Sequence, residues 1–185
     1  MKGYLKEALD KLELNEISPF DINVSINVEL SLAGWVKESD PDEFINTYVV
    51  DIMKYTSENF EEMKVIGKSL CHYISGYYAF GDGVVDIRDV ADALNGDIYA
   101  AVCPITNSEG VLSEDFVGLE SGVLYIDEFN LYPEYRGKGI GTIVFAQLID
   151  VLGREAGAIV TIPCPTEDDG STRINKNDPR HSDII

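Results

Sequence analysis

Three glycines at alternate positions mark the segment of the chain best suited to chemistry. Gly137, Gly139 and Gly141 lie between a predicted strand and a predicted helix. Glycine lacks the side chain that would keep an anion away from the backbone, and the first N–H groups of a helix have no acceptor within the helix. Arg136 and Lys138 add positive charge to an otherwise acidic chain. The segment therefore predicts a binding site for a phosphate-like anion.

The spacing of these glycines differs from two common phosphate-binding motifs. In a Walker A loop a Lys-Ser/Thr pair follows the last glycine, whereas here Thr142 follows Gly141 directly. In the dinucleotide motif GxGxxG the third glycine comes one position later than it does here. The alternative interpretation is a plain Gly-rich turn with exposed basic residues.

The segment Tyr135-Arg-Gly-Lys-Gly-Ile-Gly141, preceded by Leu131-Tyr-Pro133, resembles the central motif of the GNAT superfamily of N-acetyltransferases (Arg/Gln-x-x-Gly-x-Gly/Ala), and the likeness covers residues 123–162. The resemblance implies acetyl-CoA as cosubstrate, with its pyrophosphate on the loop amides. By position, the contacts come from Arg136, Gly137, Lys138, Gly139, Ile140, Gly141 and Thr142. The resemblance also implies that the end of the preceding strand pairs with the pantetheine arm through the backbone of Phe129, Asn130 and Leu131.

The resemblance further implies direct attack of an amine on the thioester. A lysine-like amine is mostly protonated at pH 7, so a carboxylate is needed to accept its proton, directly or through water. Asp127 and Glu128 lie on the strand that leads to the loop, and as strand neighbours they are expected to face opposite sides of the sheet. We therefore expect one catalytic carboxylate, Glu128 first, Asp127 second and Glu120 third. The alternative is that both neighbours are ordinary surface acids.

Two departures from the family pattern leave a second function open. The family's usual tyrosine acid would follow the later strand, but no tyrosine occurs after Tyr135. Tyr125, Tyr132, Tyr135 or a tyrosine from residues 73–78 could replace it, although a thiol with a pKa of about 8.5 leaves without needing an acid. Residues 164–185 are polar where the family continues with a helix and two strands, so either the domain is minimal or a partner subunit, as in a homo-oligomer, completes the sheet. The alternative function is a non-catalytic GNAT-like module that binds CoA or a protein.

The elements that position this segment follow from hydrophobic periodicity. Alternating apolar residues predict strands over 21–32, 64–78, 123–131 and 158–162, and helical stripes predict helices over 4–14, 86–95, 98–103 and 139–155. A capping pattern at 39–43 and a stripe over 44–53 favour a further helix, although the β-branched run 47–50 leaves a strand open there. Residues 104–118 are predicted as a loop.

These elements predict an α/β (α+β) fold with a mixed, mostly antiparallel sheet flanked by helices. We expect CoA to enter where two central strands splay apart. The expected organisation is an N-terminal helical segment (1–20), an acyl-CoA-binding domain (21–163) and a polar tail (164–185).

The charge of the chain restricts its partners. The formal net charge is −19, from 33 acidic and 14 basic side chains. Such a surface repels nucleic acids and anionic membranes and attracts cations, so we expect an amine acceptor that is cationic, such as a polyamine, an aminoglycoside or a lysine-bearing protein. The alternative is that acidity only keeps the protein in solution.

Cysteine and histidine usage argues against a metal site. Three cysteines without a CxxC pair and two dispersed histidines predict free thiols and no metal. Cys71 and His72 are expected to point to opposite faces of a strand, with the cysteine buried and the histidine at the surface. No apolar run is long enough for a membrane span, and Met1–Glu7 has no signal-peptide character, so a cytoplasmic location is expected.

Overall fold

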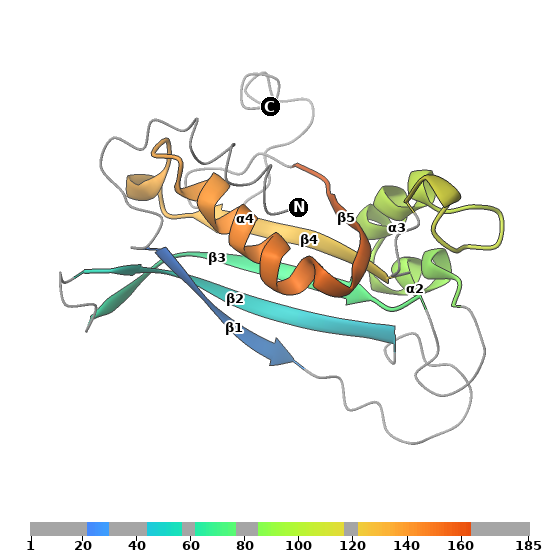
Figure 1. The fold of residues 1–185 in the computed structure, drawn as a ribbon, viewed down its shortest axis with the longest axis horizontal. Helices are drawn as coiled ribbons and strands as arrows, with labels where there is room; N and C mark the ends of the chain where they lie inside the picture. Colours follow the sequence, from blue (N-terminus) through green and yellow to red (C-terminus); the bar gives the residue numbers. More distant parts are fainter. Residues whose placement is uncertain (1–21, 30–43, 57–61, 77–84, 117–121, 164–185) are drawn as a thin grey trace.

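The computed structural model describes residues 22–29, 44–56, 62–76, 85–116 and 122–163. They form one five-stranded sheet with helices on both faces (Figure 1). The strands follow chain order across the sheet: β1 (Ile22–Glu29), β2 (Ile45–Tyr55), β3 (Met63–Ile74), β4 (Gly122–Leu131) and β5 (Ala156–Thr161). The first four pair antiparallel, and β4 pairs with β5 in parallel. The predicted mixed, mostly antiparallel sheet is confirmed. The predictions for residues 4–14, 164–185 and Glu120 lie outside the described residues.

Residues 45–55 form strand β2, so the helix predicted there is wrong and the strand left open at 47–50 is correct. The strand pairs with β1 along one edge and with β3 along the other. Val50 and Ile52 are fully buried, and Val49 and Val50 suit the pleated surface because their β-branched side chains pack well there. The hydrogen bonds along both edges of β2 outweigh the helical spacing of its apolar residues. A local sequence pattern does not indicate this pairing, because the partner strands are distant in the sequence.

In the described part of the chain, three helices cover the two faces of the sheet: α2 (Ile87–Leu94), α3 (Gly96–Val102) and α4 (Ile140–Leu152). The helices predicted over 86–95, 98–103 and 139–155 are thereby confirmed. The Asp86 carboxylate caps α2 by accepting from the N–H groups of Arg88 (2.9 Å) and Asp89 (3.4 Å), and the side chain of Asn95 caps α3. None of the helices in the described ranges is long and apolar enough to cross a bilayer.

Two apolar clusters form the core, one on each face. The side chains of β4 alternate between them, because Val123 and Tyr125 belong to the cluster with α2 and α3, whereas Leu124 and Ile126 belong to the cluster with α4. In Figure 1, α2 and α3 cover one end of the sheet and α4 runs along the other face, with its N-terminus at the opposite end. The loop that enters α4 is therefore remote from α2 and α3.

Strands β4 and β5 part before β4 ends. Their parallel pairing runs from Gly122 and Ala156 to Ile126 and Thr161, where the Thr161 hydroxyl donates to the Ile126 carbonyl (2.9 Å). Strand β4 then continues to Leu131, beside β3 alone. The predicted parting of two strands is thus present, but β5 is the edge strand of the described sheet rather than a central one.

Candidate functional site

The loop after β4 adopts a conformation that glycine favours. A single 3₁₀ turn, Pro133–Tyr135, follows the strand, and Gly139 is the residue that directly precedes α4. Gly137 has φ = 70° and Gly139 has φ = 76°, which is the left-handed region that side chains with a Cβ seldom occupy. The predicted order of strand, glycine turn and helix is confirmed, and the two glycines are required by the backbone itself.

The amides of this loop point to an anion-binding function. Within the described residues, no backbone acceptor is found for the N–H groups of residues 137–142, and the first helical bond of α4 joins Ile143 N–H to Gly139 O (3.4 Å). No side-chain hydrogen bond from the described residues caps the start of α4. The positive end of the helix dipole adds to these donors. Residues 136–142, which we call the cradle, therefore present a set of donors suited to a phosphate group.

The Arg136 side chain braces the cradle against β4. Its Nε donates to the Leu131 carbonyl (2.7 Å), and its Nη2 donates to Asn130 Oδ1 (3.1 Å). Both contacts are charge-assisted and hold the loop to the end of the strand. The sequence predicted that Arg136 contacts the anion. In the structure its guanidinium holds the loop to the end of β4, whether or not it also contacts an anion.

Lys64 of β3 and Lys138 of the cradle both contact the ring of Tyr135. The Nζ atoms of Lys64 and Lys138 lie 5.5 Å and 6.0 Å from the centroid of the Tyr135 ring, within the range of a cation–π contact. A hydrogen bond with Tyr135 raises the pKa of Lys64, so this side chain stays charged. The sequence did not indicate Lys64 as a neighbour of the loop, because its position depends on the pairing of β3 with β4. Next to that pairing, the Tyr132 N–H donates a hydrogen bond to the Ile66 carbonyl (2.9 Å).

Helix α4 is held close to the end of β4 by apolar contacts. The rings of Phe129 and Phe145 meet edge to face, with centroids 5.7 Å apart. Ile140 is fully buried at the first turn. A Cβ on Gly141 would lie 3.6 Å from Phe129, which is ordinary van der Waals contact. Rigid packing thus places Phe129–Leu131 and the cradle at one end of the sheet, as the sequence predicted.

A β-bulge changes the expected positions of the two carboxylates. The register of β3 with β4 shifts so that Cys71 faces Ile126 and Leu70 faces Glu128, which leaves Asp127 as the extra residue. Residues directly opposite each other share a face, so Glu128 lies on the face of Leu70. Asp127 lies on that face as well, where it contacts His72. The expectation that these neighbours face opposite sides is therefore wrong, because the bulge interrupts the alternation between them.

His72 is part of a buried polar group that sequence reasoning missed. Its Nδ1 lies 3.0 Å from the Thr47 hydroxyl, and its Nε2 lies 3.8 Å from Asp127 Oδ2. The side chains of His72 and Asp127 are 10% and 11% exposed. Burial lowers the pKa of His72, and the nearby carboxylate offsets part of that shift. The predicted surface histidine is thus wrong, although Cys71 is buried on the other face as expected.

The tyrosines proposed as acids take different places. Tyr125 is buried in the core, and Tyr73 donates its hydroxyl to the Glu155 carbonyl (2.8 Å). Tyr132 is exposed beside the cradle, and Tyr135 lies between the two lysines. Tyr77 and Tyr78 lie outside the described residues.

The described part of the chain contains no group of three or more His, Cys, Asp or Glu side chains that could hold a metal ion. Its two cysteines, Cys71 and Cys103, are free thiols.

The fold and the site together define a class: a mixed sheet in which a strand leaves its parallel neighbour and runs through a glycine-rich anion cradle into a helix. Comparison with known proteins agrees with this class, because residues 90–173 match the model of the acetyltransferase (GNAT) family. The resemblance seen in the sequence is thereby confirmed, and the match supports an acetyltransferase type of function. Neither the curated proteins nor the solved structures gave a significant match.

Proposed function

We propose that the protein transfers an acetyl group from acetyl-CoA to a primary amine. The observation that carries the proposal is the set of N–H groups at residues 137–142, for which no backbone acceptor is found among the described residues, at the start of a helix and within the segment matched to the acetyltransferase family. A pyrophosphate on these donors would direct the pantetheine arm along β4, past the point at which β5 leaves it.

The reaction would be a direct displacement. The amine nitrogen attacks the thioester carbonyl, the N–C bond forms and the C–S bond breaks, and the electron pair of that bond goes to sulfur. The amine proton passes to a carboxylate, for which Asp127 and Glu128 are the candidates beside the parted strands. A CoA thiol has a pKa near that of cysteine, so the thiolate leaves without strong acid assistance.

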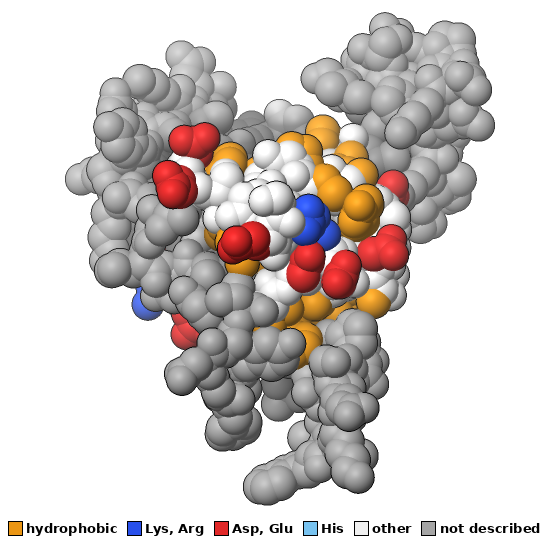
Figure 2. Space-filling model, turned by 90° about the vertical axis from the view of Figure 1, so that its right-hand side faces the viewer, with side chains coloured by type: hydrophobic (Ala, Val, Ile, Leu, Met, Phe, Trp, Pro, Cys, Tyr) orange, Lys and Arg blue, Asp and Glu red, His pale blue; other side chains and the backbone are white. Residues whose placement is uncertain are grey.

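The acceptor is proposed to be cationic. Several acidic side chains lie beside a small basic area at the end of the molecule that carries α2 and α3 (Figure 2), and the chain as a whole has a net charge of −19. Such a field raises the local concentration of cations. A polyamine, an aminoglycoside or a lysine side chain in a protein meets this requirement, and a cytoplasmic location would supply both substrates.

The proposal is tested by calorimetric titration with acetyl-CoA, followed by thiol release over a panel of amines. We expect Gly139→Asp to weaken acetyl-CoA binding by about 100-fold or more, because it places a carboxylate in the anion site and a Cβ on a left-handed backbone. Gly96→Asp is the matched control: it adds the same charge at the start of another helix, where a Cβ meets no atom within 4 Å.

Each outcome separates the proposal from its alternatives. Equal affinity of wild type and Gly139→Asp would refute the cradle as the pyrophosphate site. Binding without thiol release for any amine would favour a non-catalytic CoA-binding module. No binding at millimolar acetyl-CoA would refute both and leave a protein-interaction module.

A further inference from the structure

Three polar side chains from three neighbouring strands meet on one face of the sheet. Thr47 on β2 lies opposite His72 on β3, and the next contact is Asp127 on β4. Asp127 is the extra residue of the bulge and the first residue of β4 after its pairing with β5 ends. Asp127 therefore lies on β4 at the fork between β4 and β5, where the proposed path of the pantetheine arm passes.

The state of the histidine suits it to orient an anion. Burial lowers the pKa of His72, so the ring is neutral at pH 7 and carries one N–H. The Thr47 hydroxyl can donate to Nδ1, which leaves the proton on Nε2, facing Asp127. The distance of 3.8 Å between Nε2 and Asp127 Oδ2 is longer than a hydrogen bond. Catalytic hydrogen bonds are often long without substrate and shorten in the reacting complex.

The contacts also distinguish the two carboxylates. Glu128 is exposed, and its backbone carbonyl accepts a hydrogen bond from the Ser69 hydroxyl (2.6 Å). The Asp127 side chain is 11% exposed and lies against His72, which Thr47 orients in turn. A fixed, partly desolvated carboxylate is better placed to accept a proton in one geometry than a solvated one.

We infer that His72 is a positioning residue that holds the Asp127 carboxylate ready to accept the proton of the attacking amine. The inference rests on the proposed acetyl transfer. The proton leaves the amine nitrogen for an Asp127 oxygen as the N–C bond forms, and it then passes to solvent. His72 gains no proton and touches no substrate.

Two substitutions of His72 separate this role from packing. A glutamine amide reaches about the position of Nε2, whereas an asparagine amide reaches only that of Nδ1. His72→Gln should therefore retain kcat within about threefold, and His72→Asn should lower it about tenfold with KM for acetyl-CoA unchanged. Cys71→Ala is the control, since it removes a buried side chain at the adjacent position on the other face. Equal loss in both His72 variants would overturn the inference.

A double-mutant cycle tests whether His72 acts through Asp127. Asp127→Asn should lower kcat about 100-fold, and adding His72→Asn should lower it no further, because the positioned group is already gone. Independent, multiplying losses would show a merely structural histidine. Full activity of Asp127→Asn, with loss in Glu128→Gln, would assign the base to Glu128 and overturn the inference.

A third measurement needs no turnover. The chain has two histidines, so the ring signals of His72 can be followed by NMR titration of the full chain. Because the carboxylate raises the pKa of the ring, that pKa should be lower in Asp127→Asn than in wild type. Equal values would overturn the inference even in an active enzyme. Absence of transfer by a wild type that binds acetyl-CoA would instead refute the proposed function, and this role with it.

Discussion

Two glycine turns at opposite ends of the molecule use the same backbone conformation for different purposes. Gly110, in the turn beside α2, has φ = 77°, close to the values of Gly137 and Gly139 in the cradle. A Cβ on Gly110 would fall on the Asp86 carboxylate, whereas a Cβ on Gly137 would meet no atom within 4 Å. The turn at Gly110 is filled by the Asp86 side chain, and the turn at Gly137 is open.

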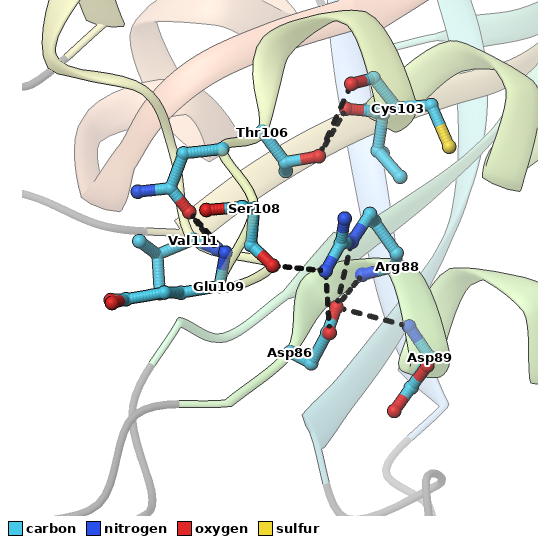
Figure 3. A network of polar contacts seen from close by, with 10 residues as sticks. Asp86, Arg88, Asp89, Cys103, Thr106, Ser108, Glu109 and Val111 are labelled. Carbon is cyan, nitrogen blue, oxygen red and sulfur yellow. Dashed lines mark hydrogen bonds and ion pairs between the residues drawn. The ribbon is translucent and has the colours of Figure 1, made fainter.

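The two turns also differ in whether their backbone N–H groups have acceptors within the protein. Beside α2, Asn107 Oδ1 accepts from the N–H groups of Glu109 (2.9 Å) and Val111 (3.3 Å), and Arg88 joins Asp86 to the Ser108 carbonyl (Figure 3). In the cradle, no backbone acceptor is found among the described residues for the N–H groups of residues 137–142. A turn that satisfies its own donors stabilises the fold, and a turn that leaves them open is suited to binding.

The largest effect on stability is expected at the closed turn. Gly110→Ala combines a strained left-handed backbone with overlap on the Asp86 carboxylate, so we expect a loss of about 3 kcal/mol in the free energy of unfolding. Urea denaturation measures this loss. The affinity of the folded fraction for acetyl-CoA should be unchanged, and a fall in affinity would contradict the separation of the two turns.

A smaller effect is expected when the carboxylate of the closed turn loses its charge. The hydrogen bond from Arg88 lowers the pKa of Asp86 below its ordinary value of 3.8. A lowered pKa stabilises the fold above pH 3.8, and this stabilisation is lost as the pH falls through the folded-state pKa. Asp86→Asn should cost about 1.5 kcal/mol at pH 7, because an ionised hydrogen bond is lost.

This cost of Asp86→Asn should shrink at lower pH. Denaturation of both proteins between pH 7 and pH 3 measures the difference. A difference independent of pH would show that the ion pair with Arg88 contributes nothing to folding.

The smallest effect on stability is expected at the open turn. Gly137→Ala meets no steric obstacle, so only the strain of the positive φ remains, about 1 kcal/mol in the free energy of unfolding. The same variant should weaken acetyl-CoA binding, because the methyl group lies beside the donors. Stability losses of equal size in Gly137→Ala and Gly110→Ala would break the contrast between an open and a filled turn.

Much of the fold and of the cradle could be predicted from local patterns. The alternation of β1, the capping aspartate of α2 and the sequence of strand, glycines and helix over 122–152 are each encoded within a few consecutive residues. The glycines at 137 and 139 report a left-handed backbone directly, since few other residues accept it. For the same reason the anion site could be located before the fold was known.

Other features depend on pairing between distant segments, and the sequence alone did not contain a readable signal for them. Strand β2 exists because β1 and β3 satisfy both of its edges, although its local spacing favours a helix. The bulge that brings Asp127 to the face of His72 is a property of the β3–β4 register, not of either strand. The position of Lys64 beside the cradle has the same origin.

The sequence by itself thus determined where the backbone takes the conformation suited to an anion, because backbone conformation and helix-end donors are local properties. Only the tertiary structure decided which carboxylate lies at the fork of β4 and β5 and which side chains support it. His72 and Asp127 are 55 positions apart in the sequence, and one register shift between β3 and β4 determines whether their side chains meet. The local chemistry was readable from residue types, whereas the geometry of the acceptor side depends on how the strands align.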